Sequence, residues 1–131
     1  MTGLDTNVLV RYLTEDEPMQ ARKAAACINT TVARGERCFL SPVVLCELSW
    51  VLLSAYDVSK ADLLLTLDRL LATTQFAIGH KDIIRHAVEA YRSGRADFAD
   101  YVIGAMSHEA GCSTTATFDR RLRNDARFQV I

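Results

Sequence analysis

The sequence lacks the features that mark several large classes of protein. It has 2 prolines and 6 glycines in 131 residues, and it contains no Gly/Ser-rich linker, low-complexity tract or internal repeat. No run of about 18 apolar residues occurs, which argues against a membrane span. The first residues also lack the basic region and apolar run of a signal peptide. We therefore expect a cytoplasmic protein that does not enter a membrane.

Cysteine and histidine are present, but without the spacing that metal sites or disulfide frameworks show. The chain has 4 cysteines and 3 histidines, with no CxxC pair and no HxxxH pair. The residues are Cys27, Cys38, Cys46 and Cys112, and His80, His86 and His108. Three of the cysteines lie in apolar surroundings. We therefore expect the cysteines to be reduced and buried, acting as small hydrophobic core residues rather than as zinc ligands or disulfides.

The sequence also has no large excess of positive or of negative charge. The formal net charge is -1, so no global basic field indicates nucleic-acid binding, and any such binding needs local arginines or bound metal. Half of the residues are hydrophobic and 24% are charged, which is ordinary for a protein with a substantial core. At this length we expect a single domain over residues 1–131.

Helical and extended patterns alternate along the chain. Pro18 suits a helix start, Ser41-Pro42 is a strong one, and Ser59 to Asp62 matches a capping box. The expected helices are 6–13, 19–34, 42–56, 59–71, 82–93 and 97–110, and the expected strands are 3–4, 37–40, 75–78, 112–118 and 128–131. The third helix is apolar nearly all round, so we expect it to be deeply buried. This alternation predicts βαβ units, a parallel sheet and an α/β sandwich.

Five acids stand where such a fold gathers functional groups. Asp5 and Asp119 each end an expected strand, and in parallel sheets ligands bind at the carboxyl ends of the strands. Asp97 and Asp100 share one face at the start of a helix, and Glu47 is the one charged residue of its apolar helix. Each also has a structural interpretation: Asp5 and Asp119 as helix caps, Asp97 with Asp100 as a capping box, and Glu47 at a solvated rim.

Together these acids indicate a metal site. Carboxylates gathered at one edge of a sheet repel one another unless cations lie among them. Oxygen ligands without histidine or cysteine select Mg²⁺ or Mn²⁺ over zinc. Such cations suit phosphoryl chemistry, because they hold a scissile phosphate and activate water, and they let an acidic pocket accept a polyanion.

Four segments resemble the signature blocks of one family. They are LDTNVLVRYL, the apolar helix with Glu47, DFADYVIGAMSHEAG and TFDRRL. In order and spacing they resemble the PIN-domain ribonucleases, and more narrowly the VapC-type toxins of bacterial and archaeal toxin–antitoxin pairs. The resemblance implies a three-layer α/β/α sandwich with about five parallel strands, usually a homodimer, and Mg²⁺- or Mn²⁺-dependent endonucleolytic cleavage of RNA. It also implies a cognate antitoxin that blocks the acidic site with its C-terminal segment.

The resemblance assigns roles by position. Asp5, Glu47, Asp100 and Asp119 match the four family acids and are the expected catalytic and metal-binding residues. Asp97 is an additional acid with a supporting role, although Asp97 and Asp100 stay alternatives for direct metal contact. Two further supporting residues follow: Thr117 matches the hydroxyl position before Asp119, and Asn7 is expected to cap the short helix, orient Asp5, or serve a purely structural role.

The expected RNA contacts are arginines. Arginines that follow the acidic segments, above all Arg11, Arg120 and Arg121, are candidates for phosphate contacts, although Arg11 could equally pair with an acid. An aspartyl phosphatase is disfavoured because Asp5 is followed by Thr6-Asn7 rather than by a second acid. A receiver domain is disfavoured because no lysine follows the last strand. A non-catalytic PIN-like module that binds RNA or protein remains the alternative to the nuclease.

Overall fold

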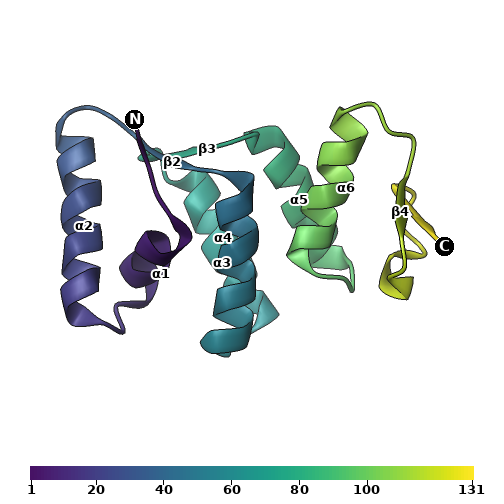
Figure 1. Cartoon of the computed structure of the whole chain (residues 1–131), viewed down its shortest axis with the longest axis horizontal. Coiled ribbons are helices and arrows are strands. Elements are labelled where there is room, and N and C mark those ends of the chain that lie inside the picture. The colour runs from purple at the N-terminus through teal and green to yellow at the C-terminus, as the bar shows by residue number, and fades with distance from the viewer. The chain divides into compact units, whose positions relative to one another are not determined.

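The structure is a computed structural model that describes all residues, 1–131. The chain divides into two compact units, Met1–Gly79 (unit 1) and His80–Ile131 (unit 2), each described here by itself. Figure 1 shows the elements of both units along the chain. The expectation of one domain over residues 1–131 stays a prediction. No helix has both the length and the apolar composition that crossing a membrane requires.

Unit 1 contains a parallel sheet of three strands and four helices. In chain order its elements are β1 (Thr2–Gly3), α1 (Thr6–Thr14), α2 (Pro18–Ala33), β2 (Cys38–Leu40), α3 (Pro42–Ala55), α4 (Lys60–Ala72) and β3 (Phe76–Ile78). The strand order is β1-β2-β3, with Thr2 opposite Cys38 and Cys38 opposite Phe76. The first strand therefore lies at one edge of this three-stranded sheet.

Local chemistry sets the helix boundaries of unit 1. The Ser41 hydroxyl accepts a hydrogen bond from the Val44 amide, and Pro42 follows at the first helical position. The Ser59 hydroxyl accepts from the Asp62 amide in the same way at the start of α4. After α2, Gly35 adopts φ 76°, a left-handed conformation that glycine tolerates. These starts are the ones that the sequence predicts.

Unit 2 pairs two helices with a small parallel sheet. Its elements are α5 (Lys81–Ser93), α6 (Phe98–Glu109), β4 (Thr115–Thr117), a 3₁₀ turn η1 (Arg120–Leu122) and β5 (Phe128–Val130). Helices α5 and α6 lie side by side (Figure 1). Gly104 of α6 lies under the Phe128 ring so closely that a Cβ there would come within 2.5 Å of it. The two-stranded sheet thus packs on α6 through one glycine and one ring.

The parallel α/β organisation and the five strands follow the prediction, but the strands form sheets of three and two. Leu45 and Leu48 of α3 are completely buried, and each contributes roughly 1.5–3 kcal/mol relative to exposure. The expectation that α3 is buried all round is wrong, because Val43 and Trp50 are 67% and 51% exposed. The face of α3 that carries Val43 and Trp50 is therefore exposed to solvent.

The expectation for the cysteines is correct only in part. All four are free thiols, but Cys27 and Cys112 are exposed, Cys46 is half-buried and only Cys38 is fully buried. Cys27 lines an open cavity between α1 and α2, and Cys112 follows the turn that ends α6. Apolar neighbours in the sequence therefore did not predict burial of these two cysteines. Burial raises the pKa of the Cys46 thiol to about 11, with help from the Glu47 charge. The Cys46 thiol is therefore protonated at neutral pH.

Candidate functional site

In unit 1, two of the predicted acids are joined by a threonine. Asp5 is the N-cap of α1, and its Oδ1 accepts a hydrogen bond of 2.8 Å from the Thr6 amide. The Thr6 hydroxyl donates a second bond of 2.8 Å to Oε1 of Glu47 on α3. Thr6 itself is only 6% exposed, whereas both acids are exposed. This Asp5–Thr6–Glu47 link holds the Glu47 carboxylate of α3 beside the start of α1, and no hydrogen bond to Asp5 Oδ2 or Glu47 Oε2 accompanies it.

In unit 2, three acids surround one arginine. The Arg121 guanidinium forms a 2.7 Å ion pair with Asp119, and its nitrogens lie 3.6 Å from Asp97 Oδ1 and 3.9 Å from Asp100 Oδ2. Arg121 Nε also donates to both Asp119 oxygens, at 3.0 and 3.1 Å. We call these four residues the acid–arginine cluster. A cation among three carboxylates relieves the repulsion that such a grouping otherwise creates.

The acids of this cluster titrate in opposite directions. Hydrogen bonds from the Arg121 side chain and amide lower the pKa of Asp119 below its usual value. Burial raises the pKa of Asp100, and the charges of Asp97 and Asp119 add to the rise. Asp119 is therefore held ionised by its partner, whereas Asp100 is protonated more readily than an ordinary aspartate.

The structural roles considered from sequence are all present. The side chains of Asp5 and Asp119 cap α1 and η1, respectively, and Asp100 Oδ2 accepts from the Asp97 amide at 3.0 Å, as in a capping box. The Thr117 hydroxyl accepts from the Asp119 amide at 3.1 Å, so it shapes the turn that presents this acid. A carboxylate accepts several bonds at once, so capping leaves room for a further ligand.

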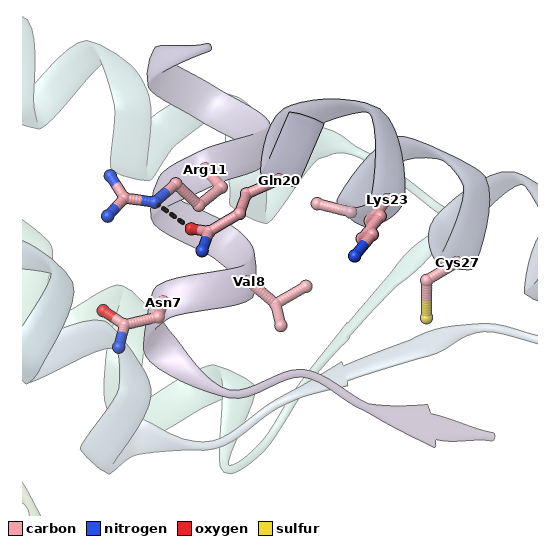
Figure 2. Close-up of a pocket in the computed structure, with 7 residues that line it drawn as sticks. Asn7, Val8, Arg11, Gln20, Lys23 and Cys27 are labelled. Carbon is pink, nitrogen blue, oxygen red and sulfur yellow. Dashed lines mark hydrogen bonds between the residues drawn. The ribbon is translucent and has the colours of Figure 1, made fainter. Parts of the chain in front are cut away.

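Asn7 does not cap the first helix. It is the second residue of α1, and the cap is Asp5. Its side chain instead lines a cavity of about 320 Å³ between α1 and α2, with Val8, Arg11 and Lys23 (Figure 2). Arg11 on this wall donates to Gln20 at 2.7 Å and pairs with Asp16 at 3.1 Å. The acid-paired alternative for Arg11 is therefore the observed one.

The donor set fits a hard divalent cation in chemistry. Every candidate ligand is a carboxylate, and Asp5 and Glu47 each keep an oxygen without a hydrogen bond. No group of three or more histidine, cysteine, aspartate or glutamate residues is placed closely enough to hold a metal ion. The structure brings the acids together as a pair in unit 1 and a cluster in unit 2, and the four-acid pocket stays a prediction.

Sequence reasoning missed two contacts. Thr6 was not singled out, although a threonine beside a strand-end aspartate is a weak signal for a hydroxyl that orients acids. Arg121 was assigned to phosphate contact, whereas it pairs with Asp97, Asp100 and Asp119. Arg120 is exposed and forms no ion pair, so it remains available to a ligand.

Comparison with known proteins identifies the family. The PIN domain model matches residues 4–127, nearly the whole chain. The chain belongs to the PIN domain family. It is also similar to a curated VapC ribonuclease of Aquifex aeolicus (strain VF5), with 24% identity over 123 residues that cover 94% of this chain and 90% of that protein. The VapC-type PIN resemblance of the sequence and its α/β class are thereby confirmed.

Proposed function

We propose that this PIN-domain protein is a Mg²⁺- or Mn²⁺-dependent endoribonuclease that acts as the toxin of a toxin–antitoxin pair. The observation that carries the proposal is the placement of the family's acids: Asp5 caps α1 beside Glu47, and Asp100 and Asp119 share Arg121. Membership of the PIN family and likeness to a VapC ribonuclease support the same activity.

The proposed division of labour follows the donor atoms. Asp5, Asp100 and Asp119 hold divalent cations, and Glu47 either completes the site or accepts the proton of the attacking water. The cation supplies charge neutralisation of the scissile phosphate and activation of water. Thr6 holds Glu47 in its rotamer, Thr117 fixes the turn before Asp119, and Asp97 supports Asp100. No histidine lies in the acid–arginine cluster to share the acid–base work.

RNA hydrolysis with defined cations tests this proposal. Purified protein is incubated with a mixed-sequence RNA in Mg²⁺, in Mn²⁺ and in EDTA, and the fragments are resolved by gel electrophoresis. Asp5→Asn removes one carboxylate charge, and Asp82→Asn, on the exposed face of α5, is the control with the same change of charge. We expect cleavage only with a cation and only in the wild type and the control. Cleavage that persists in EDTA and in Asp5→Asn would contradict the proposal.

The proposal includes a protein partner. A cognate antitoxin needs an apolar surface, and the cavity between α1 and α2 offers one (Figure 2). Met19, which is 61% exposed near the start of α2, adds to the apolar surface of these helices. Homodimerisation and a cytoplasmic location are part of the same proposal and follow from the family pattern. Co-expression with the product of a neighbouring small gene, followed by purification of the complex and an inhibition assay, tests the partner. Light scattering tests the dimer.

One observation favours the alternative of a non-catalytic PIN-like binding module. Arg121 already pairs with all three acids of unit 2, so their charge is met by a side chain without a cation. Binding of RNA without turnover in either cation would select this alternative. Turnover in Mg²⁺ or Mn²⁺ selects the nuclease, in which Asp119 would hold the cation in place of its ion pair with Arg121.

A further inference from the structure

Unit 2 contains a cavity with basic walls. A hollow of about 450 Å³ is lined by Arg95, Arg120, Arg121, Arg123 and Asn124, with no acid among its lining residues. Arg95, Arg120 and Arg123 are exposed, and none forms an ion pair. We call these three residues with Asn124 the arginine pocket. Guanidinium groups gathered without a counter-charge repel one another, and an anion between them removes that cost.

The backbone that carries Arg95 is fixed rather than free. The Ala96 amide next to it donates a 3.2 Å hydrogen bond to the Tyr101 hydroxyl, and Tyr101 is only 5% exposed. Gly94 on the other side lies so close to Tyr101 that a Cβ would overlap the hydroxyl. The connection between α5 and α6 therefore presents the Arg95 side chain from a defined position.

The second wall is anchored by a buried leucine. Leu122 of η1 is 2% exposed, and its amide donates to the Asp119 carbonyl at 3.1 Å. Arg120 lies two residues before this leucine and Arg123 follows it directly, and both arginines are exposed. A pocket whose arginines are attached to fixed backbone on both sides loses less entropy when it binds than arginines of a mobile tail would.

Arg121 connects the pocket to the acid–arginine cluster. It lines the hollow, and its guanidinium nitrogens contact Asp97, Asp100 and Asp119. An acidic site repels a polyanionic substrate, and a net charge of -1 supplies no general attraction. Local cations next to the acids meet this need, because phosphate contacts position a nucleic acid strand without reading its sequence.

We propose that the arginine pocket binds a backbone phosphate of single-stranded RNA adjacent to the phosphate that the acids would process. The inference rests on the proposed RNA substrate and adds the place where the strand is held. Arg95 and Arg120 contact the phosphate oxygens from two segments, and Asn124 donates an additional hydrogen bond. The guanidinium fork suits two phosphate oxygens at once. Binding through the backbone makes this site indifferent to base sequence.

Binding measured in EDTA tests the pocket apart from cleavage. Fluorescence anisotropy with a labelled single-stranded RNA gives the dissociation constant at several salt concentrations for the wild type, Arg95→Gln and Arg120→Gln. Arg22→Gln, an exposed arginine on α2 without an ion pair, is the control with the same change of charge. Arg95→Lys and Arg120→Lys keep the charge, and circular dichroism checks that every variant folds.

We expect each glutamine variant to bind RNA about three- to tenfold more weakly than the control, and to lose about 0.7 from the slope of log K against log salt. The lysine variants should retain most of the affinity. Equal binding by the wild type, the pocket variants and the control would overturn the inference, as would an absence of RNA binding by the wild type. Displacement of the RNA by an oligoglutamate peptide at equal charge concentration would assign the pocket to a protein partner instead.

The experiments distinguish failure of the arginine-pocket proposal from failure of the nuclease proposal. If the wild type cleaves RNA with Mn²⁺ but the pocket variants bind normally in EDTA, the pocket assignment is wrong and the nuclease proposal stands. If the pocket variants bind weakly but no cation supports cleavage by the wild type, the nuclease proposal is wrong and the pocket is an RNA-binding site of the non-catalytic module.

Discussion

The Thr6 hydroxyl donates a 2.8 Å hydrogen bond to Oε1 of Glu47 and thereby ties the first turn of α1 to α3. Thr6 follows Asp5 directly, so one residue links the positions of two acids that are remote in sequence. The hydroxyl of a buried threonine needs a partner, because an unsatisfied polar group costs about 1–3 kcal/mol. Glu47 is thus held by unit 1 itself, with or without a ligand.

Thr6→Val should weaken this link. It keeps the shape of the side chain and removes the donor, so we expect a loss of about 1 kcal/mol in the free energy of unfolding. Urea denaturation followed by circular dichroism measures the loss, and a cycle with Glu47→Ala isolates the pair. Thr6→Ser, which retains the hydroxyl, is the matched control. A coupling energy near zero in the cycle would show that the bond contributes nothing.

Arg121→Gln should change the titration of Asp119. The arginine lowers the pKa of Asp119, so its removal should let that pKa rise toward the usual aspartate value. Carboxyl carbon chemical shifts measured by NMR against pH give the pKa directly. Arg123→Gln is the control, since it removes a neighbouring charge without an ion pair to Asp119. An unchanged Asp119 pKa in Arg121→Gln would contradict the role of Arg121.

The sign of the pH effect on stability follows from the same contact. A carboxyl whose pKa is lower in the folded than in the unfolded state stabilises the fold above its unfolded pKa. That contribution disappears as the pH falls through the folded pKa. The wild type should therefore lose more stability than Arg121→Gln on acidification below the usual aspartate pKa. Burial raises the pKa of Asp100, so protonation of Asp100 acts in the opposite direction and stabilises the fold in acid.

Gly94→Ala should disturb the connection that carries Arg95. A Cβ at this position would overlap the Tyr101 hydroxyl and lie 2.9 Å from the Ala90 carbonyl oxygen. Overpacking of this kind costs about 1–3 kcal/mol, and we expect a corresponding loss in the free energy of unfolding. Gly3→Ala is the control, because no atom lies within 4 Å of a Cβ there. Equal stability of the two variants would show that the connection is not tightly packed.

Thiol reactivity should separate the cysteines into two classes. Cys27 and Cys112 are exposed, Cys38 is buried, and Cys46 combines partial burial with a pKa of about 11. We expect a disulfide exchange reagent at neutral pH to modify Cys27 and Cys112 quickly, and Cys38 and Cys46 only after unfolding. Mass spectrometry of digested protein identifies the sites. Rapid labelling of Cys38 in the native protein would contradict the packing of β2.

Local signals in the sequence predicted the helices and strands, but they did not predict contacts between residues far apart in the chain. Ser41-Pro42 and the Ser59 cap mark helix starts through neighbouring residues alone, so the starts of α3 and α4 follow from them. Strand pairing depends on segments far apart in sequence, and the split into sheets of three and two was not predicted. The burial of α3 was overestimated, because an apolar composition does not tell which face has a neighbour.

The candidate site divides in the same way. The acids could be chosen from sequence because each follows a strand or opens a helix. The partners of these acids could not be chosen in this way, because the contacts join separate elements. Thr6 on α1 binds Glu47 on α3, and Arg121 in η1 contacts Asp97 and Asp100 at the start of α6. The η1 turn that presents Arg121 has only three residues, too few for a periodic pattern.

Titration with Mn²⁺ tests the central claim most directly, and electron paramagnetic resonance reports the free ion. We predict that the wild type binds Mn²⁺, and that Asp5→Asn and Asp119→Asn each weaken Mn²⁺ binding by about tenfold or more. The exposed Asp82→Asn should bind as the wild type does. Unchanged Mn²⁺ affinity in both site variants would contradict the proposal that these carboxylates hold the metal.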